Sequence, residues 1–171
     1  MIFNLMRKFV YLSILSFLLL LNLKTAFAEE SAEWGLSSSK YWISTGFLSY
    51  HTNRKAGYNE KNTGVGFEYQ LNEESGLALG HYRNSVRRQT TYVQYVYTPF
   101  RIGNVRIGGA VGLVNGYPLL RDGKFAPALL PVVSTTFKVF DRNVGFNTVY
   151  IPSIVPNVDG ALAFQFKFAL D

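Results

Sequence analysis

The chain of 171 residues contains no cysteine and only two histidines, His51 and His81. Without cysteine, an exported chain of this size is not held together by disulfides. Zinc clusters are built mainly from cysteine and histidine, so the same shortage argues against a metal site. No motif indicates a cofactor. Charge is also scarce, since only 16% of the residues are charged.

A single long apolar run is present, and it lies near the N-terminus. Two basic residues precede a nearly apolar stretch from Val10 to Leu21, and Ala26-Phe27-Ala28 offers small residues where a signal peptidase reads. The pattern predicts a secretory signal peptide over residues 1–28, with a retained membrane helix as the alternative. Three of the 17 basic residues and no acidic residue lie in it, so cleavage lowers the formal net charge from +6 to +3. This excess is too small to predict nucleic-acid binding.

The rest of the chain shows eight short runs in which apolar residues occupy alternate positions. The last run is the clearest, with apolar residues at Leu162, Phe164, Phe166, Phe168 and Leu170. Alternate side chains of a strand point to opposite faces, so each run predicts a strand with one apolar face. The runs cover residues 41–51, 64–71, 76–82, 89–98, 104–114, 127–139, 143–151 and 161–170.

An even number of such strands, joined by turn residues, is typical of an outer-membrane barrel. We therefore predict an all-β fold, an eight-stranded antiparallel transmembrane β-barrel, over residues 40–171, after a short segment over residues 29–39. A soluble β-sandwich or a lipocalin-like barrel is the alternative, but it needs polar outward faces. Turns are expected at residues 72–75, 99–103, 141–143 and 156–157.

The faces opposite the apolar ones carry many small residues: Ala78, Gly80, Gly108, Ala110, Gly112, Ala161 and Ala163. The lumen of an eight-stranded barrel is only about as wide as its own side chains. One interpretation is that inward tyrosine, arginine and glutamine side chains fill it. The other is a narrow pocket for a slim apolar group such as an acyl chain.

Candidate chemistry lies at one rim of the predicted barrel. His51 ends the first strand, while Asn84 and Ser85 follow the third, so the three residues belong to the same end. A histidine that accepts a hydroxyl proton near a serine is the start of an acyl-transfer site. Rim histidines and serines are also common as solvated polar residues, and spacing alone does not separate these interpretations.

Four groups of residues, in order, resemble the lipid A palmitoyltransferases of the PagP type. The first is Tyr50-His51 with Tyr58-Asn59-Glu60 and Gly64-Val65-Gly66-Phe67; the others are Tyr82-Arg83-Asn84-Ser85, Pro127-Ala128-Leu129-Leu130-Pro131 and Tyr150-Ile151-Pro152. The likeness covers residues 40–168. It implies an acyltransferase of the bacterial outer membrane that moves an acyl chain, palmitate or shorter, from a phospholipid to lipid A. Small eight-stranded barrels can act alone, so we expect a monomer.

The resemblance also implies roles for particular residues. His51, Asn84 and Ser85 stand where the family has its catalytic residues, and Val96, Ala161 and Ala163 are expected to line the acyl pocket. Three prolines are expected to open a lateral path for lipid, because proline lacks the N–H that a neighbouring strand needs: Pro127, Pro131 and Pro152.

Three departures from the family pattern qualify this expectation. Asn84 replaces an aspartate, and an amide is a poorer partner for a charged histidine than a carboxylate. If that is the defect, Asn84→Asp should raise activity, and the alternative is a catalytically impaired barrel with a structural, binding or surface-altering role. Val96 stands at a small glycine of the family, which predicts a shorter acyl chain. The segment before the first strand is too short for the family's N-terminal helix.

Overall fold

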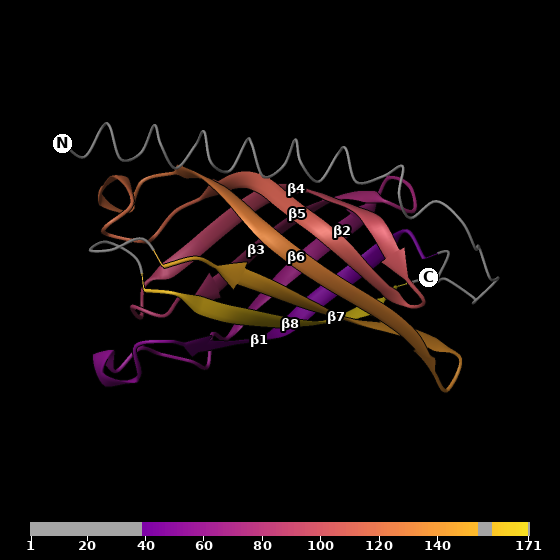
Figure 1. Cartoon of the computed structure of the whole chain (residues 1–171), viewed down its shortest axis with the longest axis horizontal. Coiled ribbons are helices and arrows are strands. Elements are labelled where there is room, and N and C mark those ends of the chain that lie inside the picture. Colours follow the sequence, from indigo (N-terminus) through magenta and orange to yellow (C-terminus); the bar gives the residue numbers. More distant parts are fainter. Residues whose placement is uncertain (1–38, 154–158, 171) are drawn as a thin grey trace. The chain divides into compact units, whose positions relative to one another are not determined.

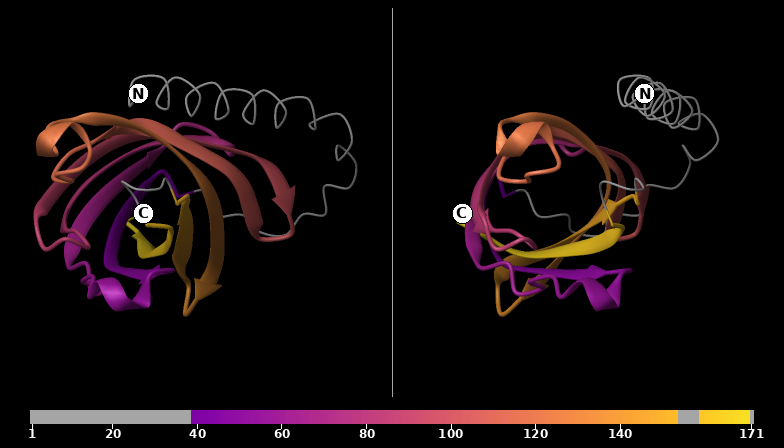
Figure 2. Two further views of the ribbon diagram at one scale, coloured as in Figure 1. Left: turned by 60° about the vertical axis from the view of Figure 1, so that its left-hand side comes forward. Right: turned by 90° about the vertical axis from the view of Figure 1, so that its left-hand side faces the viewer.

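The computed structural model describes residues 39–153 and 159–170 and shows a closed antiparallel barrel (Figures 1 and 2). Each strand pairs with the next one in the sequence, and β8 closes the ring against β1. The strands are β1 (Tyr41–His51), β2 (Gly64–Gln70), β3 (Ser75–Arg83), β4 (Gln89–Ile102), β5 (Val105–Val114), β6 (Ala126–Val139), β7 (Arg142–Ile151) and β8 (Ala161–Ala169). The predicted eight-stranded barrel is therefore confirmed. The predicted signal peptide and residues 29–38 lie outside the described residues.

The two ends of the barrel have different connections. Short turns join β2 to β3, β4 to β5 and β6 to β7 at what we call the turn end. Longer connections lie at the loop end: loop 1 (residues 52–63), loop 2 (84–88), loop 3 (115–125) and loop 4 (152–160). Loops 1 and 3 each contain a short 3-10 turn, η2 (Arg54–Ala56) and η3 (Arg121–Gly123).

The turn expected at residues 99–103 was predicted too long. β4 continues to Ile102, and only Gly103 and Asn104 connect it to β5. Pro99 is tolerated inside the strand because the pairing with β5 shifts by one residue between Tyr97 and Phe100. Such a bulge leaves a residue outside the regular ladder, so a missing N–H breaks no pairing there.

Large apolar side chains cover the outer face of the ring. Exposed examples come from strands all around the barrel: Ile43, Val65, Leu77, Leu79, Val93, Tyr95, Val111, Leu113, Val133, Leu162, Phe166 and Phe168. A soluble barrel would place polar groups on this face, whereas a membrane-spanning barrel faces hydrocarbon there. Within the described residues, no helix is long and apolar enough to cross a membrane.

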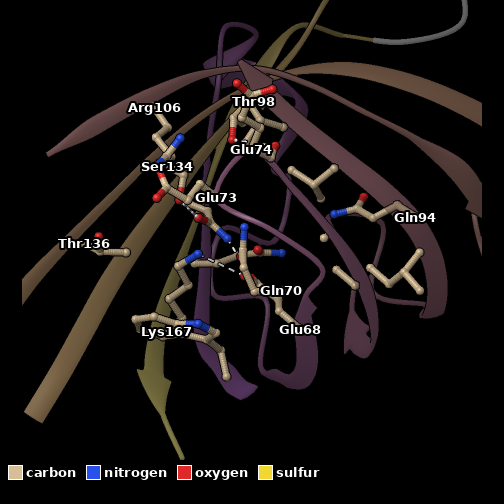
Figure 3. A pocket seen from close by; sticks show the side chains of 18 of the residues that line it. Glu68, Gln70, Glu73, Glu74, Gln94, Thr98, Arg106, Ser134, Thr136 and Lys167 are labelled. Atoms are coloured by element: carbon tan, nitrogen blue, oxygen red, sulfur yellow. Dashed lines mark hydrogen bonds and ion pairs between the residues drawn. The ribbon is translucent and has the colours of Figure 1, made fainter. Parts of the chain in front are cut away.

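The half of the lumen near the turn end is filled by a buried polar network (Figure 3). At its centre the Glu68 carboxylate accepts hydrogen bonds from Ser44 Oγ (3.0 Å) and Asn147 Nδ2 (2.7 Å), and it pairs with Lys167 Nζ (3.0 Å). Lys167 also lies over the Trp42 ring, 5.0 Å from its centroid. A polar cavity of only about 80 Å³ remains beside this network.

The half of the lumen near the loop end is aromatic instead. The rings of Phe47 and Tyr82 stack with centroids 5.4 Å apart, and Tyr92 packs against the same cluster. Glycine is required opposite Tyr92, because a Cβ on Gly80 would lie 2.5 Å from the Tyr92 ring. The small inner residues of the sequence therefore have two uses, since some accommodate large rings and others, described next, line open space.

Candidate functional site

A mostly apolar cavity of about 230 Å³ lies at the loop end of the barrel. Small residues leave this space open, and Ala110, Ala161 and Ala163 are among its lining residues. Gln94 and Gln165 line both this cavity and the small polar one. The larger cavity therefore adjoins the polar network at one end, and residues of loops 1, 2 and 3 line its other end.

His51 faces this cavity because of a bulge in β1. Before the bulge, Trp42 and Ser44 point into the barrel; regular alternation from them would send His51 outwards. The pairing with β8 shifts by one residue between Thr45 and Leu48, and Gly46 has a positive φ of 61°. Glycine adopts this left-handed conformation without steric cost. The shift turns Phe47, Ser49 and His51 inwards.

The His51 ring is almost fully buried, with 5% of the residue exposed, and its Nδ1 has no hydrogen-bond partner among residues 39–153 and 159–170. The nearest acid is Glu60, whose Oε1 lies 3.7 Å from Nδ1. The Tyr58 ring packs against the imidazole with centroids 4.5 Å apart. A small rotation of either side chain would let Nδ1–H donate to Glu60, which is the contact that orients a catalytic histidine.

The residues of loop 1 hold this arrangement in place. Glu60 accepts the backbone N–H of His51 at 3.1 Å and pairs with Arg54. The Arg54 guanidinium and the His51 N–H together hold the pKa of Glu60 below its usual value. Tyr58 donates its hydroxyl to Asp159 at 2.7 Å, and this bond raises the pKa of the Tyr58 hydroxyl. Loop 1 is thereby fastened to the start of β8.

Asn84 is fully buried and all of its side-chain hydrogen-bonding positions are used. Its Nδ2 donates to Thr90 Oγ1 and to the carbonyl of Gly116, both at 2.9 Å. Its Oδ1 accepts from the backbone N–H groups of Val86 (3.0 Å) and Arg88 (2.9 Å). The side chain therefore builds loop 2 and joins it to loop 3, and the structure shows it in no contact with His51.

Ser85 lines the same cavity as His51. Its carbonyl accepts a hydrogen bond from the Asn59 backbone at 2.8 Å, and its side chain interacts with the Tyr117 hydroxyl. Of the three predicted catalytic residues, His51 and Ser85 are thus brought to one pocket, while Asn84 lies behind it.

The predicted pocket residues divide in a similar way. Ala161 and Ala163 line the larger cavity. Val96 lines the small polar cavity and packs against the cluster formed by Phe47, Ala78 and Tyr92. It therefore lies beneath the aromatic layer rather than on the wall of the larger cavity.

The predicted prolines border a break in the sheet between β6 and β7. Residues of β6 from Ala126 onwards pair with β5, but pairing with β7 begins only at Val132, opposite Val149. Pro127 and Pro131 are exposed on the unpaired part of β6, and Pro152 directly follows β7. Four residues on the two sides of this break line the larger cavity: Ala128, Leu130, Val149 and Ile151.

The sequence interpretation missed several residues of the site. Tyr58, Glu60 and Tyr82 were noticed only as parts of motifs, and Asp159 and Tyr117 were not singled out. An isolated glycine inside a strand is a known signal for a bulge, so Gly46 could have indicated that His51 turns inwards. The described residues contain no cluster of acids and histidines able to hold a metal ion.

The closed ring with its apolar outer face and its inner cavity makes this protein a transmembrane β-barrel that encloses a mostly apolar space. No protein-family model and no curated protein matches the chain. A solution NMR structure of a de novo designed protein, TMB2.3, is similar with a TM-score of 0.49 and 12% sequence identity. The similarity covers 78% of this chain and 95% of the designed one.

Proposed function

We propose that the protein is a bacterial outer-membrane acyltransferase that moves an acyl chain, palmitate or shorter, from a phospholipid to lipid A. The observation that carries the proposal is the mostly apolar cavity with His51 and Ser85 on its wall. A narrow apolar pocket suits an acyl chain, and the two polar residues suit an ester at its mouth. The break between β6 and β7 would let the chain enter from the membrane.

The proposed reaction uses His51 as a general base. His51 takes the proton from a lipid A hydroxyl, whose oxygen attacks the carbonyl carbon of the phospholipid ester. The bond between that carbon and the glycerol oxygen breaks, and His51 returns the proton to the departing lysophospholipid. Ser85 donates a hydrogen bond to the carbonyl oxygen, where negative charge develops.

In this scheme Glu60 replaces the family's aspartate as the carboxylate partner of the charged histidine. Its carboxylate is the nearest acid to His51, and Arg54 keeps it ionised and fixed. Asn84 is left with the structural task of holding loop 2. The departure at position 84 is therefore compatible with catalysis, since a carboxylate reaches the histidine from loop 1 instead.

The proposal predicts a change in lipid A mass. In cells that express the protein, lipid A should gain the mass of one acyl chain, and His51→Ala and Ser85→Ala should each remove that gain. His81→Ala is the matched control, because His81 lies on the exposed side of β3 and its ring bonds to Thr91, away from the cavity. Its spectrum should equal that of the unchanged protein. Mass spectrometry of extracted lipid A measures all four cases.

An unchanged spectrum in every case would refute the enzyme. The second candidate would then stand, a barrel of the same descent that binds an acyl chain without transferring it. Asn84 favours this second candidate, because an amide stands where the family has an acid. The hydrogen bonds of that amide are all used within loops 2 and 3 and β4.

The break between β6 and β7 gives a separate prediction. Pro131→Val restores an N–H directly before Val132, where the pairing with β7 begins. One additional ladder hydrogen bond of about 1 kcal/mol should close the break and lower the rate of acyl transfer about fivefold. Pro99→Val, at the bulge in β4, is the control and should leave the rate unchanged. Equal rates for both variants would show that lipid does not enter between β6 and β7.

A further inference from the structure

Loop 2 and the last residue of β3 present three exposed arginines, Arg83, Arg87 and Arg88. They flank Ser85, which lines the larger cavity, within a segment of six residues. Arginine recognises phosphate with a planar fork of donors, so a group of three at the mouth of a pocket can select its ligand.

Residues 83–88, which we call the arginine turn, have a backbone that is fixed by hydrogen bonds. Asn84 Oδ1 accepts the N–H groups of Val86 and Arg88, and the Arg88 carbonyl accepts the Asn84 N–H at 2.8 Å. Arg87 has a positive φ of 62°, which a residue with a side chain adopts at a cost. The buried Asn84 holds that conformation, so the arginine side chains project from a backbone of defined geometry.

The guanidinium groups have no acidic partner in the part of the chain that the structure describes. Arg87 Nη2 donates to the Gly57 carbonyl at 3.1 Å and Arg83 Nε to the Arg87 carbonyl at 3.4 Å. Arg88 lies beside loop 3, since a Cβ on Gly123 would be 4.0 Å from its Nη1. Among the described residues, none of the three forms an ion pair. At the turn end, by contrast, Arg106 pairs with Glu73 and Lys138 with Asp141.

The surroundings add to the positive charge. The described parts of loops 1 to 4 carry seven basic and three acidic residues. Glu60 pairs with Arg54 and Asp159 accepts the Tyr58 hydroxyl, so the bonds of these two acids within the described residues go to loop 1 and the end of β1, and not to the arginine turn. The remaining acid is Asp122 of η3. An anionic group is therefore the natural occupant of this rim.

We propose that Arg83, Arg87 and Arg88 bind a phosphate group of the lipid A acceptor and so hold its sugar beside Ser85. The inference rests on the proposed function, because it assigns the acceptor to one side of that site. The break between β6 and β7 is separated from loop 2 by β4, β5 and β6. A phospholipid that enters there approaches Ser85 from the β6 side and keeps its phosphate on that side, whereas the acceptor can approach from loop 2, which favours the acceptor as the source of the phosphate.

The test measures binding of lipid A with and without its phosphates to the full-length protein in neutral detergent micelles. The double variant Arg87→Gln/Arg88→Gln should bind the bis-phosphorylated form at least about tenfold more weakly, because each arginine contributes on the order of fivefold near a lipid surface. Binding of the dephosphorylated form should not change. Raising the salt concentration should reduce the difference in affinity for bis-phosphorylated lipid A between the unchanged protein and the variant.

The matched control is Lys138→Gln/Arg142→Gln, which removes two positive charges at the turn end. It should bind both forms as the unchanged protein does. Arg87→Lys/Arg88→Lys keeps the charge and should lose less affinity than the glutamine variant. Equal affinity of the glutamine variant and the control for bis-phosphorylated lipid A would overturn the inference, provided that circular dichroism shows an intact barrel in both.

The same proteins separate this inference from the proposed function. Phosphate-dependent binding that is lost in the glutamine variant, without acyl transfer by any protein, would keep the arginine site and refute the enzyme. Acyl transfer by the unchanged protein, with binding unaffected in the glutamine variant, would keep the enzyme and refute the site. Competition by inorganic phosphate alone, with no preference between the two lipid forms, would also overturn the inference, since it would show a general anion site.

Discussion

Asn84→Asp should destabilise the barrel and should not raise acyl transfer. An ionised aspartate cannot donate, so it loses the bonds to Thr90 Oγ1 and the Gly116 carbonyl, and its charge faces that carbonyl from a fully buried position. Thr90 cannot compensate freely, because its hydroxyl donates to the Asn115 carbonyl at 3.0 Å. We expect a loss of about 3 kcal/mol in the free energy of unfolding. Urea unfolding in detergent micelles measures it.

Asn104→Asp is the control for the same chemical change. Asn104 lies in the exposed turn between β4 and β5, so its replacement should alter stability by less than about 0.5 kcal/mol. The structure thus reverses what the sequence suggested for Asn84, where a carboxylate was expected to improve catalysis. If Asn84→Asp raised acyl transfer and kept full stability, Asn84 rather than Glu60 would be the partner of His51.

Ala110→Leu should shorten the acyl chain that the protein accepts. Ala110 is buried, with 3% exposed, and lines the larger cavity from β5. Interiors are packed closely enough that three added carbon atoms remove the space for about three carbons of the ligand. The preferred chain should therefore become shorter by about three methylenes. Transfer from phospholipids of defined chain length, followed by mass spectrometry of lipid A, gives the preference directly.

Val111→Leu is the control for this substitution, since Val111 is the next residue of β5 and points outwards to the lipid-facing side. It should leave the preferred length unchanged. A preference that stayed the same in both variants would show that the acyl chain does not occupy the cavity beside Ala110. The chain would then lie elsewhere, and the proposed site would need to be abandoned.

The fold could be predicted from the sequence because alternation is a local property. The run predicted over 161–170 is β8 (Ala161–Ala169), and the one over 76–82 is β3 (Ser75–Arg83). Alternation also placed Leu162 and Phe166 on the outer face. The prediction from alternation failed where the period is interrupted, as at Pro99, because a bulge adds one residue to a strand without any change in composition.

The site could be predicted only in part, for a different reason. His51 and Ser85 were found because their residue types and their end of the barrel follow from the strand order. The role of Asn84 depends on Gly116 of loop 3 and Thr90 of β4, and the position of Glu60 depends on Arg54 of the same loop. Such contacts have no period and no fixed spacing, so the residue string does not show them.

The buried polar network around Glu68 also bears on permeability. A barrel of eight strands has little room along its axis, and here Glu68, Lys167 and Asn147 occupy that room with directly bonded side chains. Ions and water-soluble solutes would have to separate a buried ion pair in order to pass, which is costly in a confined interior. We therefore expect the barrel to conduct neither ions nor water-soluble solutes, so that its insertion would add no leak to a membrane.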